Sequence, residues 1–119
     1  MKMKFVLLLA FSLLFATTAF AFDRPTTYIR GCNFSKCPYK TVGESIDESL
    51  ENPRWESGKA TDGELIVNVE GIVTWQGKRY KAMLQFAPTP KGFKTNGVSL
   101  NGQEMSEEFK KTFITELCK

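Results

Sequence analysis

Side-chain character alternates along residues 65–75 of this chain and, after a short break, along residues 80–86. A period of two predicts β-strands that each present one apolar face. Between them, Gly77-Lys78 predicts a two-residue hairpin turn with glycine first, where a positive φ is needed. The turn sets the register on both faces. The apolar face would pair Trp75 with Tyr80, Val73 with Ala82, Gly71 with Leu84, and Val69 with Phe86. The opposite face would pair Thr74 with Lys81, Ile72 with Met83, and Glu70 with Gln85.

A short helix is predicted before these strands. Thr41 and Glu44 have the spacing of a capping box, in which each side chain bonds the backbone N–H of the other residue. Apolar residues then recur at every fourth position from Val42 to Leu50. The helix should end at Asn52-Pro53, because the residue before a proline disfavours helical geometry.

The remaining elements are predicted from turn and cap residues. Phe93 to Val98 favours a third strand with a bend or bulge at Asn96-Gly97, and Asn101-Gly102 favours a turn. Ser106 can cap a last helix. We therefore expect an α+β fold of helix, three-stranded antiparallel sheet and helix, with both helices packed on one face of the sheet. Residues 41–119 would form this single domain, preceded by an irregular arm over residues 22–40, which show neither period.

The first 21 residues have the form of a secretory signal peptide. Two lysines precede an apolar run from Phe5 to Phe15, and Ala19 and Ala21 supply the small residues of a cleavage site. Cleavage would leave Phe22 as the N-terminus. The rival interpretation is an uncleaved anchor, since the apolar stretch approaches the lower limit of ~17 residues for a membrane span. Cleavage predicts a bacterial periplasmic or secreted protein without membrane attachment.

Composition excludes several functions. Loss of the leader leaves 98 residues, 14 basic and 13 acidic, which argues against nucleic-acid binding. The chain has no histidine, so Ser-His and Cys-His nucleophiles are absent. Four carboxylates cluster near the centre of the chain: Glu56, Asp62, Glu64 and Glu70. No signal in the sequence places two of them across a cleft, as glycoside chemistry would need. We therefore expect that the protein is not an enzyme and that it binds no cofactor and no metal.

Three cysteines suit a small domain in an oxidising compartment. A bridge between Cys37 and Cys118 would tie the arm to the last helix and close a long loop, worth on the order of 4 kcal/mol. There are two alternatives: a local bridge between Cys32 and Cys37, and a bridge between Cys32 and Cys118. We favour the long bridge from Cys37, which leaves the thiol of Cys32 either free or paired between two chains. The chain has no histidine, and three cysteines cannot complete the usual tetrahedral zinc set alone.

Four apolar residues lie where binding is conceivable. Ile66, Ile72 and Met83 occupy the expected polar face of the sheet, where a partner or the N-terminal arm could cover them. We favour the arm, through Tyr28, Ile29 or Phe34. Trp55 follows the helix-ending turn, where it would either close the core or form part of a recognition loop. We favour the core.

Residues 42–100 carry several short motifs, some of them within the predicted strands. They are Val42-Gly43-Glu44, Asp47, Asn52-Pro53-Arg54-Trp55-Glu56-Ser57, Glu70-Gly71, Gln85-Phe86 and Asn96-Gly97-Val98. With these motifs the chain resembles a family of small exported or membrane-associated bacterial α+β domains of uncharacterised function. The resemblance implies a compact accessory domain of the cell envelope and supplies no catalytic residues. The cysteines lie outside its motifs.

Together these features predict an exported, non-catalytic accessory or binding protein whose partner is another envelope or secreted protein. The alternative is an inhibitor or immunity protein against a cell-wall hydrolase or toxin, since rigid loops bind with little ordering cost. The sequence leaves the oligomeric state open.

Overall fold

A computed structural model describes residues 22–119 of the chain; the predicted leader, with Ala21, lies outside this range. The described helices are α2 (Arg24–Gly31), α3 (Val42–Ser49) and α4 (Glu107–Leu117). The strands are β1 (Glu51–Lys59), β2 (Leu65–Trp75), β3 (Lys78–Thr89), β4 (Gly92–Leu100) and β5 (Gln103–Glu104). They form one antiparallel sheet in the order β1-β2-β3-β4-β5.

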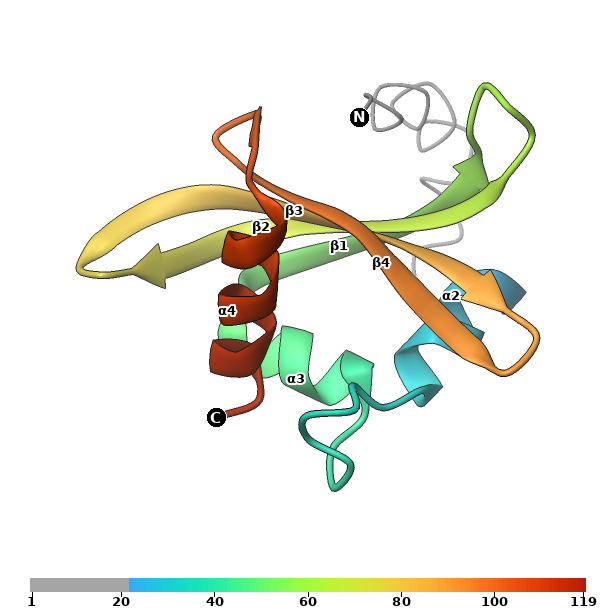
Figure 1. The fold of residues 1–119 in the computed structure, drawn as a ribbon, viewed down its shortest axis with the longest axis horizontal. Helices are drawn as coiled ribbons and strands as arrows, with labels where there is room; N and C mark the ends of the chain where they lie inside the picture. The colour runs from blue at the N-terminus through green and yellow to red at the C-terminus, as the bar shows by residue number, and fades with distance from the viewer. Residues whose placement is uncertain (1–21) are drawn as a thin grey trace.

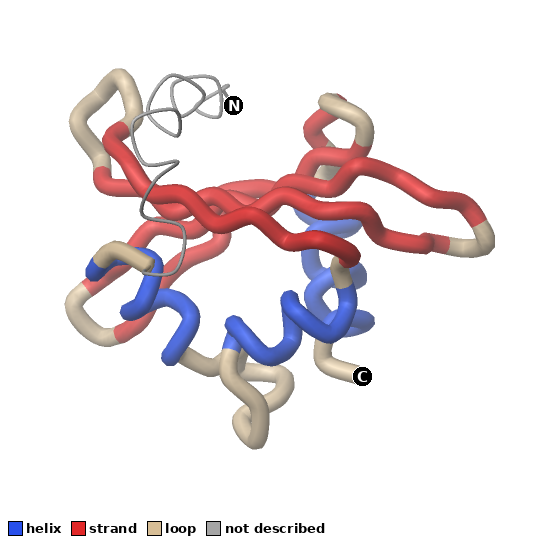
Figure 2. Tube along the Cα trace, turned by 180° about the vertical axis from the view of Figure 1, so that it is seen from behind, coloured by secondary structure: helices blue, strands red, loops and turns tan. Residues whose placement is uncertain are grey.

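The three helices lie together on one side of the twisted sheet (Figure 1). Seen from behind, the strands form one layer and the helices a second (Figure 2). We call the side toward the helices the inner face and the other side the outer face. Val67, Val69 and Leu84 are fully buried on the inner face and form one core with residues of the three helices. The sheet and helices are thus held together by a single apolar layer.

The prediction of two helices and a three-stranded sheet is wrong, because the described residues form three helices and five strands. The first missed strand is β1, whose opening residues have the composition of a loop. Asn52 has a φ of 52°, and the pairing with β2 is irregular between Glu51 and Arg54. A bulge at the start of an edge strand accommodates Pro53, which has no N–H to contribute to the ladder.

The prediction of an irregular arm is also wrong in part, because residues 22–40 contain α2. Asp23 caps this helix by accepting a hydrogen bond from the Thr26 N–H at 2.9 Å. Pro25 lies in the first turn, where its missing N–H is not needed. The helix packs inward: Ile29 is fully buried and Phe34, just beyond the helix, is 4 % exposed in the same core. The expectation that these residues cover the outer face is therefore wrong.

The register of the β2–β3 hairpin differs from the prediction by two residues. The turn residues are Gln76 and Gly77, with φ values of 51° and 83°, and Trp75 pairs with Lys78. Displacing a turn by one residue moves the pairing by two, so every side chain stays on its predicted face. The observed pairs include Val73 with Tyr80, Gly71 with Ala82, Val69 with Leu84 and Val67 with Phe86.

Both predicted helix caps, the bulge in β4 and the turn that follows β4 are confirmed. Thr41 and Glu44 form both hydrogen bonds of the capping box, at 3.0 and 2.9 Å. Ser106 accepts from the Phe109 N–H at 3.1 Å and starts α4. Asn96 is the extra residue where the β3–β4 register shifts, and Asn101-Gly102 forms the β4–β5 turn with positive φ at both residues. These short-range signals are read correctly because each depends only on residues close in sequence.

Candidate functional site

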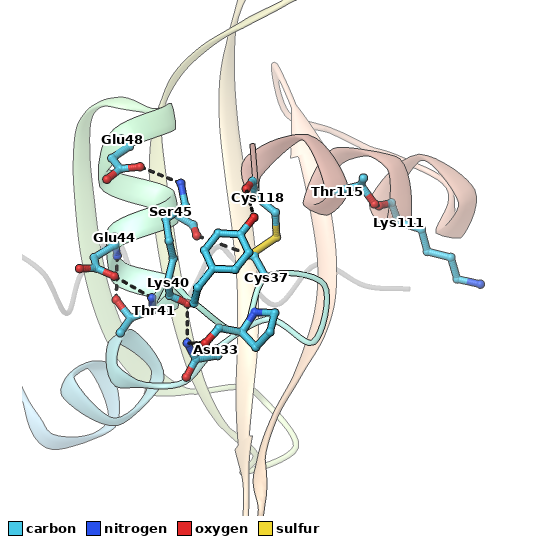
Figure 3. The surroundings of a disulfide bond; sticks show 12 residues. Asn33, Cys37, Lys40, Thr41, Glu44, Ser45, Glu48, Lys111, Thr115 and Cys118 are labelled. Atoms are coloured by element: carbon cyan, nitrogen blue, oxygen red, sulfur yellow. Dashed lines mark hydrogen bonds and ion pairs between the residues drawn. A yellow bond between two sulfur atoms is a disulfide. The ribbon is translucent and has the colours of Figure 1, made fainter.

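The predicted Cys37–Cys118 disulfide is present and joins residues 81 positions apart, with Cα atoms at 5.5 Å (Figure 3). The loop that carries Cys37 is fixed on both sides of the bridge. The Tyr39 hydroxyl donates to the Cys118 carbonyl at 3.3 Å, and the Asn33 amide donates to the carbonyls of Pro38 and Lys40. This loop, residues 32–40, is therefore anchored to the end of α4.

The three outer-face residues predicted as a possible binding surface differ in their exposure. Ile66 is fully buried with Ala60 in a second, small cluster. Ile72 and Met83 are half-buried. Beside them, Glu70 forms ion pairs with Arg54 at 3.3 Å and Lys81 at 3.9 Å. The aliphatic parts of such long side chains cover apolar neighbours while the charges stay in water.

Trp55 closes the core, as predicted, and lies on β1 rather than in a recognition loop. Its ring stacks near Phe86, with centroids 6.4 Å apart and planes at 18°. The Arg30 guanidinium lies 4.9 Å from the ring centroid, a cation–π contact. The indole N–H points toward Asp47 Oδ1 at 3.4 Å. Every polar and aromatic part of this side chain is thus engaged within the domain.

Asn68 and Gln85 pair across β2 and β3 on the outer face, and both are buried, at 4 % and 2 % exposure. Gln85 Oε1 accepts from the Asn96 amide at 2.9 Å. Asn68 Oδ1 and Nδ2 and Gln85 Nε2 have no hydrogen-bond partner among the described residues. Such an atom costs stability wherever the fold does not replace the water that solvates it in the unfolded chain.

A groove lies between three segments that are distant in sequence. The loop 32–40, the β3–β4 hairpin and α4 line this groove, whose volume is about 660 Å³. This size suits a short peptide or a small ligand. Its wall includes the apolar side chains of Phe93 and Ile114 and the hydroxyl residues Ser35, Thr89 and Thr95. We call it the lysine groove, because three lysines line it.

Three exposed lysines line the groove: Lys36 from the loop, Lys91 from the hairpin and Lys111 from α4. No carboxylate is among the lining residues, and none of the three lysines forms an ion pair within residues 22–119. Lys111 extends away from the disulfide side of α4 (Figure 3). The groove is therefore a concentration of positive charge in a nearly neutral protein.

Cys32, the free cysteine, lines the same groove. Partial burial raises the pKa of its thiol, an effect that the hydrogen bond to the Tyr28 carbonyl opposes. A thiol with a raised pKa is mostly protonated at neutral pH and is a poor nucleophile.

The sequence did not reveal the lysine groove, because Lys36, Lys91 and Lys111 have no common period or motif. Only the disulfide, by fixing the loop to α4, offered a hint that these segments meet. A second hollow of about 510 Å³ lies between α4 and the end of β2, and it carries no lysine or arginine; its lining includes Ser49, Trp75, Thr112 and Glu116.

The carboxylates singled out in the sequence do not gather into a site. Glu70 is ion-paired on the outer face, and Glu64 forms an ion pair with Lys94 at 3.3 Å. Within residues 22–119, no cluster of three or more histidine, cysteine, aspartate or glutamate side chains has the arrangement of a metal site.

No protein-family model, curated protein or solved structure matches this chain. Among the described residues, no helix combines the length and the apolar character that crossing a bilayer requires.

Proposed function

We propose that this protein is an exported, non-catalytic binding protein that works in the periplasm or outside the cell, where it engages another envelope or secreted protein. The lysine groove is the observation that carries this proposal. It is open, it is preformed by a loop held at the disulfide, and its charge is not neutralised by the protein's own carboxylates. Preformed surfaces bind with a smaller ordering cost than flexible ones.

The proposed location rests on two independent features. The leader ends at a small-residue cleavage site before Phe22, and the disulfide suits an oxidising compartment. Expression from the full coding sequence in a bacterial host, followed by osmotic-shock fractionation and intact-mass measurement, tests it. We expect the shock fluid or medium to contain a chain that begins at Phe22. A membrane-bound product with an intact leader would contradict this part of the proposal.

Binding is tested by comparing two variants with the same change in charge. Lys91→Glu/Lys111→Glu reverses two lysines of the groove, whereas Lys59→Glu/Lys78→Glu reverses two exposed lysines elsewhere that form no ion pair among the described residues. Captured envelope proteins are identified by mass spectrometry, and the candidates are then purified and titrated. We expect a partner that binds the wild type and the control variant but not the groove variant. Equal binding by both variants would remove the groove from the proposal.

A further inference from the structure

We infer that the lysine groove binds an acidic peptide segment, which adds as a further strand along the open edge of β4. This inference rests on the proposed function, since it specifies how the protein partner is recognised. It is carried by three features of the groove: an unpaired strand edge, three lysines without carboxylate partners, and an apolar wall between them.

The edge of β4 is open along its first half. β5 pairs only with Ser99 and Leu100, so the described strands leave residues 92–97 without a partner on that side. In the β3–β4 hairpin, Thr89 pairs with Gly92 across a two-residue turn. Such closing pairs exchange both hydrogen bonds, and the backbone groups of alternate residues then point away from the partner strand. The backbone groups of Phe93 and Thr95 therefore face the groove.

One hydrogen bond shows that a backbone carbonyl of β4 points toward the groove. The Lys110 ammonium donates to the Thr95 carbonyl at 2.9 Å, so that carbonyl points from β4 toward α4. An incoming peptide would find the N–H and C=O of Phe93 and the N–H of Thr95 still open. Strand addition supplies matching donors and acceptors in the spacing that these groups require.

The side chains around this edge select the composition of the peptide. Lys91 lies in the hairpin turn and Lys111 on α4, so an extended segment beside β4 passes between two positive charges. Phe93 and Ile114, both half-buried, offer apolar contact to aliphatic residues of the same segment. The fitting sequence therefore combines acidic and aliphatic residues. An acyl chain lacks the backbone groups to pair with the edge, which favours a peptide over an anionic lipid.

The probe is the peptide acetyl-Glu-Leu-Glu-Leu-Glu-amide, titrated into the purified, exported protein and followed by 15N–1H spectra. We expect the largest shifts at residues 93–95 and 111–114, and slower alkylation of Cys32 by iodoacetamide in the bound state. The neutral analogue with glutamine in place of glutamate should bind on the order of tenfold more weakly, as expected from the loss of two or three exposed ion pairs. Equal affinity of the two peptides would overturn the inference.

Backbone pairing is tested with two N-methylated versions of the probe, one methylated at the leucines and one at the glutamates. Strand addition uses the N–H groups of alternate residues only, so one version should bind like the parent and the other should not bind. Equal binding of both would exclude strand addition. Lys91→Glu/Lys111→Glu should lose the probe, and Lys59→Glu/Lys78→Glu should keep it; loss of binding in both variants would contradict a site at the groove.

The experiments distinguish failure of the strand-addition inference from failure of the proposed function. A partner that depends on the two groove lysines, together with no binding of the peptide probe, would overturn strand addition and leave the proposed function standing. Probe binding with the expected charge and methylation dependence supports the inference even where no partner is recovered. Decanoate binding at residues 93–95 with higher affinity than the peptide would overturn the inference in favour of an amphiphilic anion.

Discussion

The two faces of the sheet are stabilised in different ways. On the inner face, helices cover apolar residues such as Val67 and Phe86, and a disulfide joins two of the covering segments. On the outer face, Glu70 and its basic partners lie beside half-buried apolar residues. The buried side-chain amide of Asn68 has no hydrogen-bond partner among residues 22–119. The comparison indicates that stability resides on the inner face, whereas the outer face carries polar groups at a cost.

The largest expected effect comes from the disulfide of the inner side. Cys37→Ser/Cys118→Ser should lower the free energy of unfolding by about 4 kcal/mol, because the bridge closes a loop of 81 residues and limits the entropy of the unfolded chain. About 1 kcal/mol shifts the melting temperature of a domain this size by roughly 4–8 °C. Calorimetry should therefore show a fall of more than about 15 °C.

Cys32→Ser is the matched control for this experiment. Serine keeps a donor for the Tyr28 carbonyl and leaves the bridge intact, so the melting temperature should change little. A large fall in this variant, or an unchanged transition in the double variant, would mean that the bridge is not what holds α4 and the loop to the core.

The second prediction concerns Gly71→Val and tests how tightly α3 packs against the sheet. A Cβ atom at Gly71 would lie 2.8 Å from the Glu51 carbonyl oxygen and 3.0 Å from Leu50 Cβ. Both contacts are with atoms that cannot swing away, so Gly71→Val should destabilise the domain by roughly 1–3 kcal/mol in urea unfolding. The crowded neighbours are thus at the junction of α3 and β1, not Leu84, which the predicted register had placed opposite.

Gly31→Ala provides the comparison for a glycine without close neighbours, since nothing lies within 4 Å of the added Cβ. Its effect should stay within about 0.5 kcal/mol. Similar losses in both variants would indicate a general cost of replacing glycine and would remove the argument from packing.

Local signals explain which parts of the fold the sequence predicts. The capping box at Thr41, the cap at Ser106 and the alternation along residues 65–75 involve neighbours in sequence, and all are confirmed. β1 was missed because Asn52-Pro53 is a strong breaker signal, which a bulge at a sheet edge tolerates. α2 is not predicted because residues 22–40 show no apolar period, although Asp23 and Pro25 are well placed for a helix cap and a first helical turn.

The lysine groove shows the limit of such prediction. Lys36, Lys91 and Lys111 meet only after the disulfide, the hairpin and α4 are placed in space. The outer face shows a related limit, because alternation identifies which residues share a face but not which of them are buried. Ile66 is expected on the outer face under the N-terminal arm, and the structure instead buries it in a small cluster with Ala60.

The third prediction concerns the outer face itself. Asn68→Val removes two buried polar atoms that have no partner among the described residues and places a β-branched residue in a central strand. The free energy of unfolding should rise by about 1 kcal/mol, measured by urea titration. Gln85→Leu should stabilise less, because its Oε1 accepts a hydrogen bond from Asn96 that the variant would lose. Destabilisation by Asn68→Val would show that this amide is solvated or paired in solution.

The smallest effect is the pH dependence of an exposed ion pair on the outer face. Glu51 accepts hydrogen bonds from the Arg79 guanidinium at 2.8 and 3.0 Å, which lowers the pKa of this carboxyl below its ordinary value of 4.5. A carboxyl whose pKa is lower in the folded state stabilises the fold above its unfolded pKa, and this contribution disappears as the pH falls through the folded value. NMR titration of the Glu51 side chain in Arg79→Gln should show the pKa return toward 4.5, with a slightly flatter decline of stability in acid. An unchanged pKa in this variant would mean that the pair does not form in solution. The outer face would then owe still less of its stability to charge, and the contrast with the inner face would be larger.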